Sequence, residues 1–322
     1  MPRFKIHHVT KYTYKGDVRD SANQVILYPI NDQYQEVIKQ QLTITGNPAV
    51  EMYRDYYGNE VGLFMRADAH KELVIDSKVE VVTRSRAMPE DGAPVAAQWE
   101  SLPQLAKEIM FIDFFTLERV ASQDEIRAVS AQFHSPGMSP LEVSRNVMGY
   151  VYNEFSYITG ITSVETTLEE VWKLKAGVCQ DFAHIMTVML RMLGIPARYV
   201  SGYICPHENG MRGEGATHAW VEGYIPNYGW IGLDPTNNCI ANDMHVRLAV
   251  GRNFSDCSPV KGSYKGTSQH TLEVGVSVSY EDGLRHVENS IVLTPQPVLN
   301  TDTENNNSYR RYMEMIQQQQ QQ

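Results

Sequence analysis

One segment, residues 179 to 193, constrains the fold more than any other part of the chain. From Phe182 to Leu193 it is apolar at almost every position, and its spacing is that of a helix. A helix that is apolar nearly all round has to be buried, so other elements must cover it on most sides. We expect its narrow polar stripe to meet a loop or the N-terminal domain. The stripe consists of Gln180, His184, Thr187 and Arg191.

Signals for helix starts precede this segment, and strand signals follow it. A serine or threonine followed by a glutamate three positions later is typical of a capped helix start, and so is an early proline. These signals occur at Ser101 with Pro103, Ser122 with Glu125, Ser139-Pro140 with Glu142, and Thr167 with Glu170. Strands are predicted at 199–203, 219–224 and 230–233. Helices followed by an antiparallel sheet indicate an α+β domain.

The N-terminal region reads as a separate β-rich domain over residues 1–86. Phe4, Ile6, His8, Thr10, Tyr12 and Tyr14 alternate with polar residues, as do Leu73, Ile75, Ser77, Val79 and Val81. Several short strands at this spacing predict a sandwich-like antiparallel arrangement. Proline and glycine then indicate a linker over 87–100.

The predicted catalytic domain covers residues 101–298. Alternation from Leu272 to Tyr280 predicts a strand, and 291–295 is expected to add another. These C-terminal strands could pack on the N-terminal domain. Residues 299–322 are polar and rich in glutamine, so we expect a disordered tail.

Charge and cysteine usage narrow the functional classes. The net charge is −10 and no dense Lys/Arg run occurs, which argues against nucleic acid or an anionic membrane as partner. Neither a signal peptide nor an apolar run of membrane-spanning length is visible, so a cytoplasmic location is expected. The four cysteines lack Cys-x-x-Cys spacing, and we predict free thiols, no structural zinc and no cofactor.

Three residues are candidates for chemistry, although each has an ordinary structural interpretation. Cys179 stands where the buried helix begins, and the helix dipole there favours a thiolate. Buried cysteines are, however, common in protein cores. His218 lies in a predicted strand, and Asp234 lies at a strand end before Pro235, where an aspartate is usually a turn residue. The order Cys, His, Asp matches a thiol nucleophile, its base and the group that orients the base.

Four motifs carry a resemblance to a known family. They are Ala176-Gly-Val-Cys-Gln-Asp-Phe-Ala-His184, Gly194-Ile-Pro-Ala-Arg-Tyr-Val-Ser-Gly-Tyr203, Ala216-Thr-His-Ala-Trp220 and Gly232-Leu-Asp-Pro-Thr-Asn237. In these motifs the chain resembles the bacterial transglutaminase-like cysteine protease family. The resemblance is dense from Thr167 to Asn238 and extends more loosely to the β-rich N-terminal region.

The resemblance implies a papain-like, transglutaminase-like core with helices packed on an antiparallel sheet. It also implies a catalytic triad in which Cys179 is the nucleophile, His218 the general base and acid, and Asp234 the residue that holds the imidazole. The chain departs from the family in one loop, because Gly251-Arg-Asn-Phe254 stands where Gly-Arg-Asp-Tyr is usual. That departure puts a polar role of the loop in doubt and leaves the triad intact.

Residues near the triad are weaker candidates. Trp172, Gln180 and Trp220 could support an oxyanion or line the cleft, although a tryptophan is more often a core residue. Asp181 is expected to serve as a first-turn carboxylate of the buried helix. A zinc site built from Cys179, His184, His218 and Asp234 is disfavoured, because the helix angle separates its first two members.

Three functions stay open at this point. The first is a cysteine hydrolase acting on peptide or isopeptide amide bonds, with a protein or peptide as substrate. The second is transamidation, in which a glutamine acyl group passes to an amine and cross-links proteins. The third is a catalytically silent binding module, which the intact Cys179, His218 and Asp234 disfavour.

Overall fold

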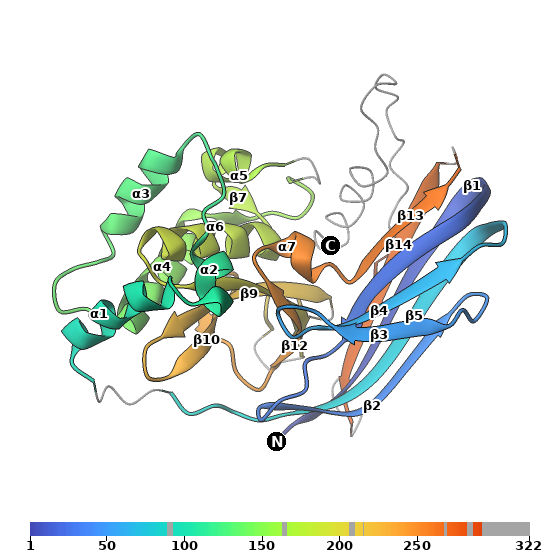
Figure 1. Cartoon of the computed structure of the whole chain (residues 1–322), viewed down its shortest axis with the longest axis horizontal. Coiled ribbons are helices and arrows are strands. Elements are labelled where there is room, and N and C mark those ends of the chain that lie inside the picture. The colour runs from blue at the N-terminus through green and yellow to red at the C-terminus, as the bar shows by residue number, and fades with distance from the viewer. Residues whose placement is uncertain are drawn as a thin grey trace.

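The computed structural model describes residues 1–88, 93–162, 166–205, 210–214, 216–266 and 269–281, and the backbone of 286–291. Figure 1 shows the molecule as a helical region beside an elongated β region, with a smaller sheet under the helices. The predicted α+β class is confirmed.

The β region is an eight-stranded antiparallel sheet that curls around strand β1 (Arg3–Tyr28). The first half of β1 pairs with β5 and β14, and its second half pairs with β4 and β13. The other members of the sheet are β2 (Gln35–Ile44), β3 (Val50–Arg54), β4 (Glu60–Arg66), β5 (His70–Thr83), β13 (Val260–Lys265), β14 (His270–Tyr280) and β15 (His286–Ile291). Segments from both ends of the chain therefore build one sheet.

The predicted alternation in β1 and β5 agrees with the burial of their side chains. All six residues from Phe4 to Tyr14 on the predicted face are buried, and so are the five from Leu73 to Val81. They meet the buried face of β14, whose Val274, Val276 and Val278 lie in the same core. Period-two burial is what a sheet with one covered face requires.

The described part of the chain contains seven helices. They are α1 (Val95–Leu105), α2 (Ile109–Phe115), α3 (Gln123–Ala131), α4 (Pro140–Glu154), α5 (Leu168–Leu174), α6 (Cys179–Met192) and α7 (Phe254–Cys257). Helix α1 begins inside the range predicted as linker, and Pro103 lies within the helix instead of opening it. Helix α2 was not predicted, since a seven-residue helix leaves little periodic pattern.

Helix starts were predicted well where a capping box forms. Ser139 with Glu142 and Thr167 with Glu170 each make both reciprocal hydrogen bonds. The capping box predicted for Ser122 and Glu125 is wrong, because the Ser122 side chain makes no cap bond. Its hydroxyl and backbone N–H instead donate to the Glu169 carboxylate, at 2.7 Å each. A tertiary partner therefore replaced the local one.

Helix α6 lies against a five-stranded antiparallel sheet of order β11-β10-β9-β8-β12. Figure 1 shows helices α4 and α6 over this sheet, which contributes Tyr199, Ala219 and Val221 to their shared core. The strands are β8 (Ala197–Ile204), β9 (Thr217–Ile225), β10 (Gly229–Asp234), β11 (Cys239–Ile240) and β12 (His245–Gly251). A two-stranded parallel sheet, β6 (Ser156–Tyr157) with β7 (Ala176–Gly177), leads into α6.

Two of the four residues in the polar stripe of α6, His184 and Arg191, bond segments outside the helix, whereas the Thr187 hydroxyl donates to a carbonyl within it. The backbone N–H of Phe254 donates to Nε2 of His184 at 3.1 Å. Arg191 is buried and donates to the carbonyls of Ala197, Thr116 and Arg252. The stripe therefore fixes the segment that leads into α7.

The β region and the five-stranded sheet meet along β12. The Gln35 carboxamide accepts from the N–H of Arg247 at 2.7 Å and donates to its carbonyl at 2.8 Å. Asn59 bonds the N–H and the carbonyl of Val250 in the same way, both at 2.8 Å. Two side-chain amides thus occupy positions along β12 where a neighbouring strand would bond.

Two predictions fall wholly or largely outside the described residues. These are the tail over 299–322 and most of the strand predicted at 291–295; β15 ends at Ile291. Among the described residues, none of the helices combines the length and apolar character needed to cross a membrane.

Candidate active site

The three predicted site residues come from three neighbouring elements. Cys179 is the first residue of α6, His218 is the second residue of β9, and Asp234 is the last residue of β10. Strands β9 and β10 pair directly, and α6 packs on β9. All three residues are buried, with exposures of 1%, 0% and 0%.

Asp234 performs two tasks with its two oxygens. Oδ1 accepts from the backbone N–H groups of Thr236 and Asn237, at 2.9 and 3.2 Å, and so forms the turn that an Asp-Pro sequence favours. Oδ2 accepts from Nε2 of His218 at 3.0 Å and from the Asn237 side chain at 2.8 Å. Asp234 is therefore a turn residue, as an Asp-Pro sequence usually is, and it also bonds the predicted base His218.

The second nitrogen of His218 lies on the thiol side. Nε2 is committed to Asp234, and Nδ1 bonds none of the nitrogen and oxygen atoms of the described residues. The thiol of Cys179 is nonetheless close enough to contribute a hydrogen bond and a charge interaction to the pKa of His218. Nδ1 is thus the nitrogen available to exchange a proton with Cys179.

The electrostatics of the pair favour an imidazolium. Burial lowers the pKa of His218, but the charges of Asp234 and Cys179 and the hydrogen bonds to both outweigh it and raise the pKa to about 10. For Asp234, burial raises the pKa, and the charge and hydrogen bond of His218 outweigh it, so the pKa falls well below the ordinary range. A buried carboxylate is stable only with such partners.

A second histidine reaches the same carboxylate. Nε2 of His245, at the start of β12, lies 3.3 Å from Oδ2 of Asp234, and the ring is buried. No motif or spacing in the sequence points to this residue. It lies 11 positions beyond Asp234 (245 − 234), in a strand that is not adjacent to β10.

The backbone of residues 210–214 lies against the histidine. A Cβ placed on Gly213 would fall 2.6 Å from Nδ1 of His218, and Gly213 has a φ of +87°. Asn237 holds this loop, because it accepts from the N–H of Arg212 at 2.9 Å and donates to the carbonyl of Arg212 at 3.1 Å. The Arg212 guanidinium lies over the rings of Tyr152 and Tyr157. A side chain at position 213 would crowd the base.

Two further ionisable side chains lie near the start of α6. The pKa of Tyr157 is raised by burial and by the negative charge of Cys179. Asp181 accepts from the N–H of Val178 and the hydroxyl of Thr162, both at 2.9 Å, and burial raises its pKa to about 6. The predicted first-turn role of Asp181 is confirmed.

The three auxiliary candidates occupy different surroundings. Trp172 is 1% exposed and packs with Tyr150 and Phe155 under the ammonium of Lys175, which is the core position that a tryptophan usually takes. Trp220 lies beside His218, with ring centroids 6.1 Å apart. Gln180 is buried, and its Oε1 has no hydrogen-bond partner among the described residues.

Metal-ligating side chains converge at one place in the described structure. Donor atoms of Asp234, Cys239 and His245 lie within 4.8 Å of one another. We assign these groups to the hydrogen-bond network, because both oxygens of Asp234 already accept from N–H groups. His184, part of the zinc alternative, is not in this group, since its Nε2 bonds Phe254.

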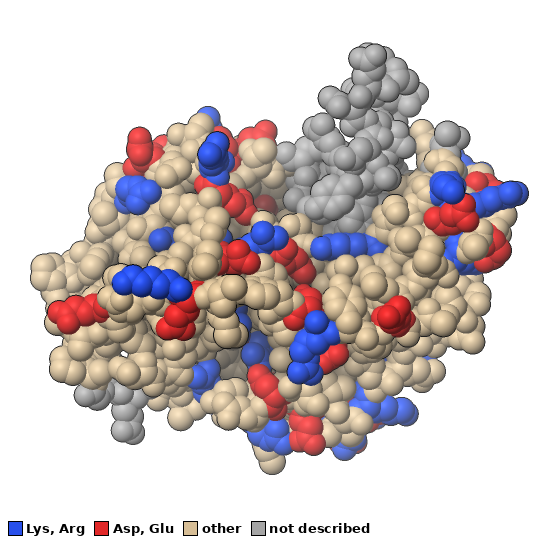
Figure 2. All heavy atoms as spheres, viewed as in Figure 1, with Lys and Arg blue, Asp and Glu red and all other residues tan. Residues whose placement is uncertain are grey.

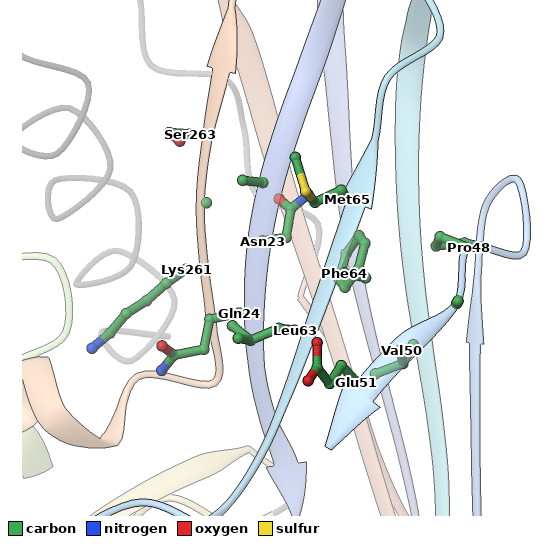
Figure 3. Close-up of a pocket in the computed structure, with 13 residues that line it drawn as sticks. Asn23, Gln24, Pro48, Val50, Glu51, Leu63, Phe64, Met65, Lys261 and Ser263 are labelled. Atoms are coloured by element: carbon green, nitrogen blue, oxygen red, sulfur yellow. The ribbon is translucent and has the colours of Figure 1, made fainter. Parts of the chain in front are cut away.

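A pocket of about 840 Å³ lies elsewhere, on the β region. Figure 3 shows Leu63, Met65, Gln24, Glu51 and Lys261 along it, from strands β4, β1, β3 and β13. None of the predicted site residues lines it. On the face drawn in Figure 2, acidic and basic side chains are interspersed.

Two separate parts of the chain match known family models. Residues 127–235 match the transglutaminase-like superfamily, and residues 4–82 match the bacterial transglutaminase-like N-terminal region. An uncharacterized protein of Mycobacterium tuberculosis is 32% identical over 290 residues, which cover 86% of this chain and 92% of that protein. A protein-glutamine gamma-glutamyltransferase of Pseudomonas aeruginosa is 33% identical over 121 residues, 36% of this chain and 18% of that enzyme.

Among solved structures, a candidate cysteine protease from Cytophaga hutchinsonii matches with a TM-score of 0.68 at 21% identity. The match covers 87% of this chain and 91% of that one, which supports the same fold. The transglutaminase-like, papain-like fold class expected from the sequence is confirmed. The chain belongs to the transglutaminase-like superfamily and carries the bacterial N-terminal region of that family.

Proposed function

We propose that this protein is a cysteine-dependent acyl-transfer enzyme that hydrolyses peptide or isopeptide amide bonds. The observation that carries the proposal is the buried hydrogen bond between Asp234 and Nε2 of His218. It leaves Nδ1 on the side of Cys179, at the start of α6. This is the arrangement of a nucleophile, its base and the group that orients the base.

Proton transfer from the Cys179 thiol to Nδ1 of His218 gives the thiolate–imidazolium pair that the raised pKa of His218 favours, and the reaction starts from this pair. The thiolate attacks the amide carbonyl carbon, and the carbonyl π electrons move to oxygen. In this scheme the backbone N–H groups and the dipole at the start of α6 stabilise the negative charge that develops on the carbonyl oxygen. The intermediate collapses as the C–N bond breaks, and His218 protonates the leaving amine. A thioester on Cys179 remains.

Water completes the cycle. His218 removes a proton from the water, the hydroxyl attacks the thioester, and the C–S bond breaks to release the carboxylic acid and the thiolate. Asp234 stays ionised throughout and stabilises the imidazolium. A primary amine in place of water would give transamidation, the activity named for the Pseudomonas aeruginosa relative. A protein or peptide substrate and a cytoplasmic location stay predictions.

The first test compares the four thiols within one molecule. Burial raises the pKa of Cys239 to about 12 and the pKa values of Cys205 and Cys257 well above their ordinary range. Iodoacetamide labelling between pH 5 and 9, read by mass spectrometry, should modify Cys179 at pH 6 at least about tenfold faster than Cys239. His218→Ala should abolish that advantage. Equal rates for the two cysteines, or an advantage that survives His218→Ala, would refute the proposal.

The second test identifies the acceptor. Isopeptide and peptide libraries are incubated with wild type and Cys179→Ala, with and without a biotinylated primary amine. Hydrolysis predicts cleavage that needs Cys179 and that continues without the amine. Incorporation of biotin in place of cleavage would favour transamidation. Absence of both reactions across the libraries would favour the silent binding module.

A further inference from the structure

The carboxylate of Asp234 is shared between two imidazoles. Oδ2 lies 3.0 Å from Nε2 of His218 and 3.3 Å from Nε2 of His245. All three side chains are buried, with exposures of 0%, 1% and 0% for His218, His245 and Asp234. A third donor, the Asn237 amide, reaches the same oxygen at 2.8 Å.

The Asp234 carboxylate determines which nitrogens of His218 and His245 carry a hydrogen toward it. A carboxylate oxygen accepts, so each nitrogen that faces Oδ2 carries a hydrogen. At the other end of the His245 ring, Nδ1 lies 3.3 Å from the backbone nitrogen of Asn242 and 3.4 Å from Oδ1 of the same residue. Nε2 of His245 is thus the donor to Asp234, and the contacts of Nδ1 with Asn242 hold the other side of the ring.

The His245 ring is held from several sides. Trp220 contacts it edge to face, with centroids 5.2 Å apart. The residue two positions earlier, Asp243, is bonded from the β region by the hydroxyls of Thr83 and Ser85, at 2.5 and 2.7 Å. Two positions later, Arg247 bonds the carboxamide of Gln35. The β region therefore fixes the backbone on both sides of His245.

We propose that His245 is a positioning residue that holds the Asp234 carboxylate in the orientation required by His218. This inference rests on the proposed function, because it assigns His245 a part in the same reaction. His245 touches neither the thiol nor the reacting carbonyl in that scheme. It acts through Asp234, by preventing rotation of the carboxylate and by sharing its negative charge.

Loss of the N–H donor of His245 should raise the pKa of His218. Without it, more of the negative charge on Oδ2 acts on His218, so the imidazolium becomes more stable and the pKa of His218 rises. The other ionisable groups around Asp234 and His218 are unchanged by the substitution. They are Cys179, Cys239 and Tyr157, with Arg212 and Asp181 acting on Tyr157.

The experiment is an NMR titration of the His218 ring in the full-length chain between pH 7 and 11. His245→Leu should shift the His218 midpoint upward by about half a pH unit or more. His245→Asn keeps a polar side chain that is too short for Oδ2, and it should give the same shift if the leucine variant does not fold. His245→Gln presents an N–H near the original Nε2 and should restore the wild-type midpoint.

The matched control is His8→Leu. His8 is equally buried and bonds the Tyr203 hydroxyl at 2.9 Å, yet it has no contact with Asp234 among the described residues. It should lower the melting temperature without moving the His218 midpoint. In hydrolysis assays, His245→Asn should lower kcat about tenfold with little change in KM.

A wild-type His218 midpoint in both His245→Leu and His245→Asn would overturn the inference, and so would failure of His245→Gln to restore it. These outcomes are separable from failure of the proposed function. The titration follows the imidazole directly and needs no turnover. A chain without an activated Cys179 would still report whether His245 acts on Asp234.

Discussion

Replacing Asp234 by asparagine tests the electrostatic basis of the site. The substitution keeps the size of the side chain and an acceptor for the turn N–H groups of Thr236 and Asn237. It removes the negative charge opposite His218. The amide N–H₂ group would then face the Nε2 donors of His218 and His245. Burial lowers the pKa of His218, and the Asp234 charge that mainly counteracts this effect would be absent.

The size of the effect follows from the pKa of His218. This pKa rises from an ordinary value of 6.5 to about 10. At about 1.4 kcal/mol per pKa unit, the difference of about 3.5 corresponds to at most about 5 kcal/mol for the interactions that hold the imidazolium. The same interaction also lowers the pKa of Asp234, so its free energy is counted for His218 and is not added again for Asp234.

The direction in which the pKa of His218 is shifted determines how its contribution to stability changes with pH. Because the folded pKa of His218 is raised, the stabilisation is complete below about pH 6.5 and is lost as pH rises toward about 10. Asp234 contributes in the opposite range: its folded pKa is lowered, so its share is lost as pH falls below its ordinary value of 3.8.

The assay is urea unfolding of wild type and Asp234→Asn at intervals from pH 5 to 10.5. The difference in unfolding free energy should be largest near pH 6 and should shrink steadily above pH 7. Subtraction removes the titration of tyrosine, lysine and the other cysteines, which both proteins share. A difference that stays constant from pH 6 to 10 would refute the assignment of a charged pair to His218 and Asp234.

Three further substitutions test the packing around the site. Gly213→Ala should slow Cys179 labelling and hydrolysis by about tenfold or more, because its Cβ would lie 2.6 Å from Nδ1 of His218. Gly210→Ala is the control in the same assays, because Gly210 also has a positive φ but no atom within 4 Å of its Cβ position. Gly202→Ala should lower the unfolding free energy in urea by about 1–3 kcal/mol or more, because its Cβ would lie 2.1 Å from a β12 carbonyl oxygen. Gly275 is a strand glycine with no atom within 4 Å of its Cβ position, and a loss as small as that of Gly275→Ala would contradict the prediction. Arg191→Met should lower the unfolding free energy by roughly 3 kcal/mol or more in the same assay, because three backbone carbonyls lose a buried donor. A melting temperature equal to that of wild type would argue against a stabilising role of Arg191.

Much of the fold could be read from local patterns. The alternation of β1 and β5 and the all-round apolar character of α6 follow directly from which faces are buried. Two capping boxes marked the starts of α4 and α5 because both partners are local in sequence. Local signals failed at Ser122, where Glu169 supplied the partner from 47 positions away.

The site was accessible to sequence reasoning in part. Cys179, His218 and Asp234 stand in motifs whose residue types suit thiol chemistry, and the structure places them together. His245 was missed, because its contact with Asp234 crosses the sheet and leaves no trace in spacing. Gly213 was missed for a similar reason, since its importance lies in what a side chain there would strike.

The carboxamides of Gln35 and Asn59 carry a consequence for the evolution and engineering of this chain. Strand β12 ends its sheet, and an uncovered strand edge invites pairing with other chains. Here two amide side chains from the β region present the donor and acceptor pairs of a missing strand. A catalytic domain cut free of residues 1–86 would expose Arg247 and Val250 to the solvent and to its neighbours. We expect such a fragment to self-associate through the exposed edge of β12. In the full chain, the β region covers this edge and so protects it from pairing with other chains.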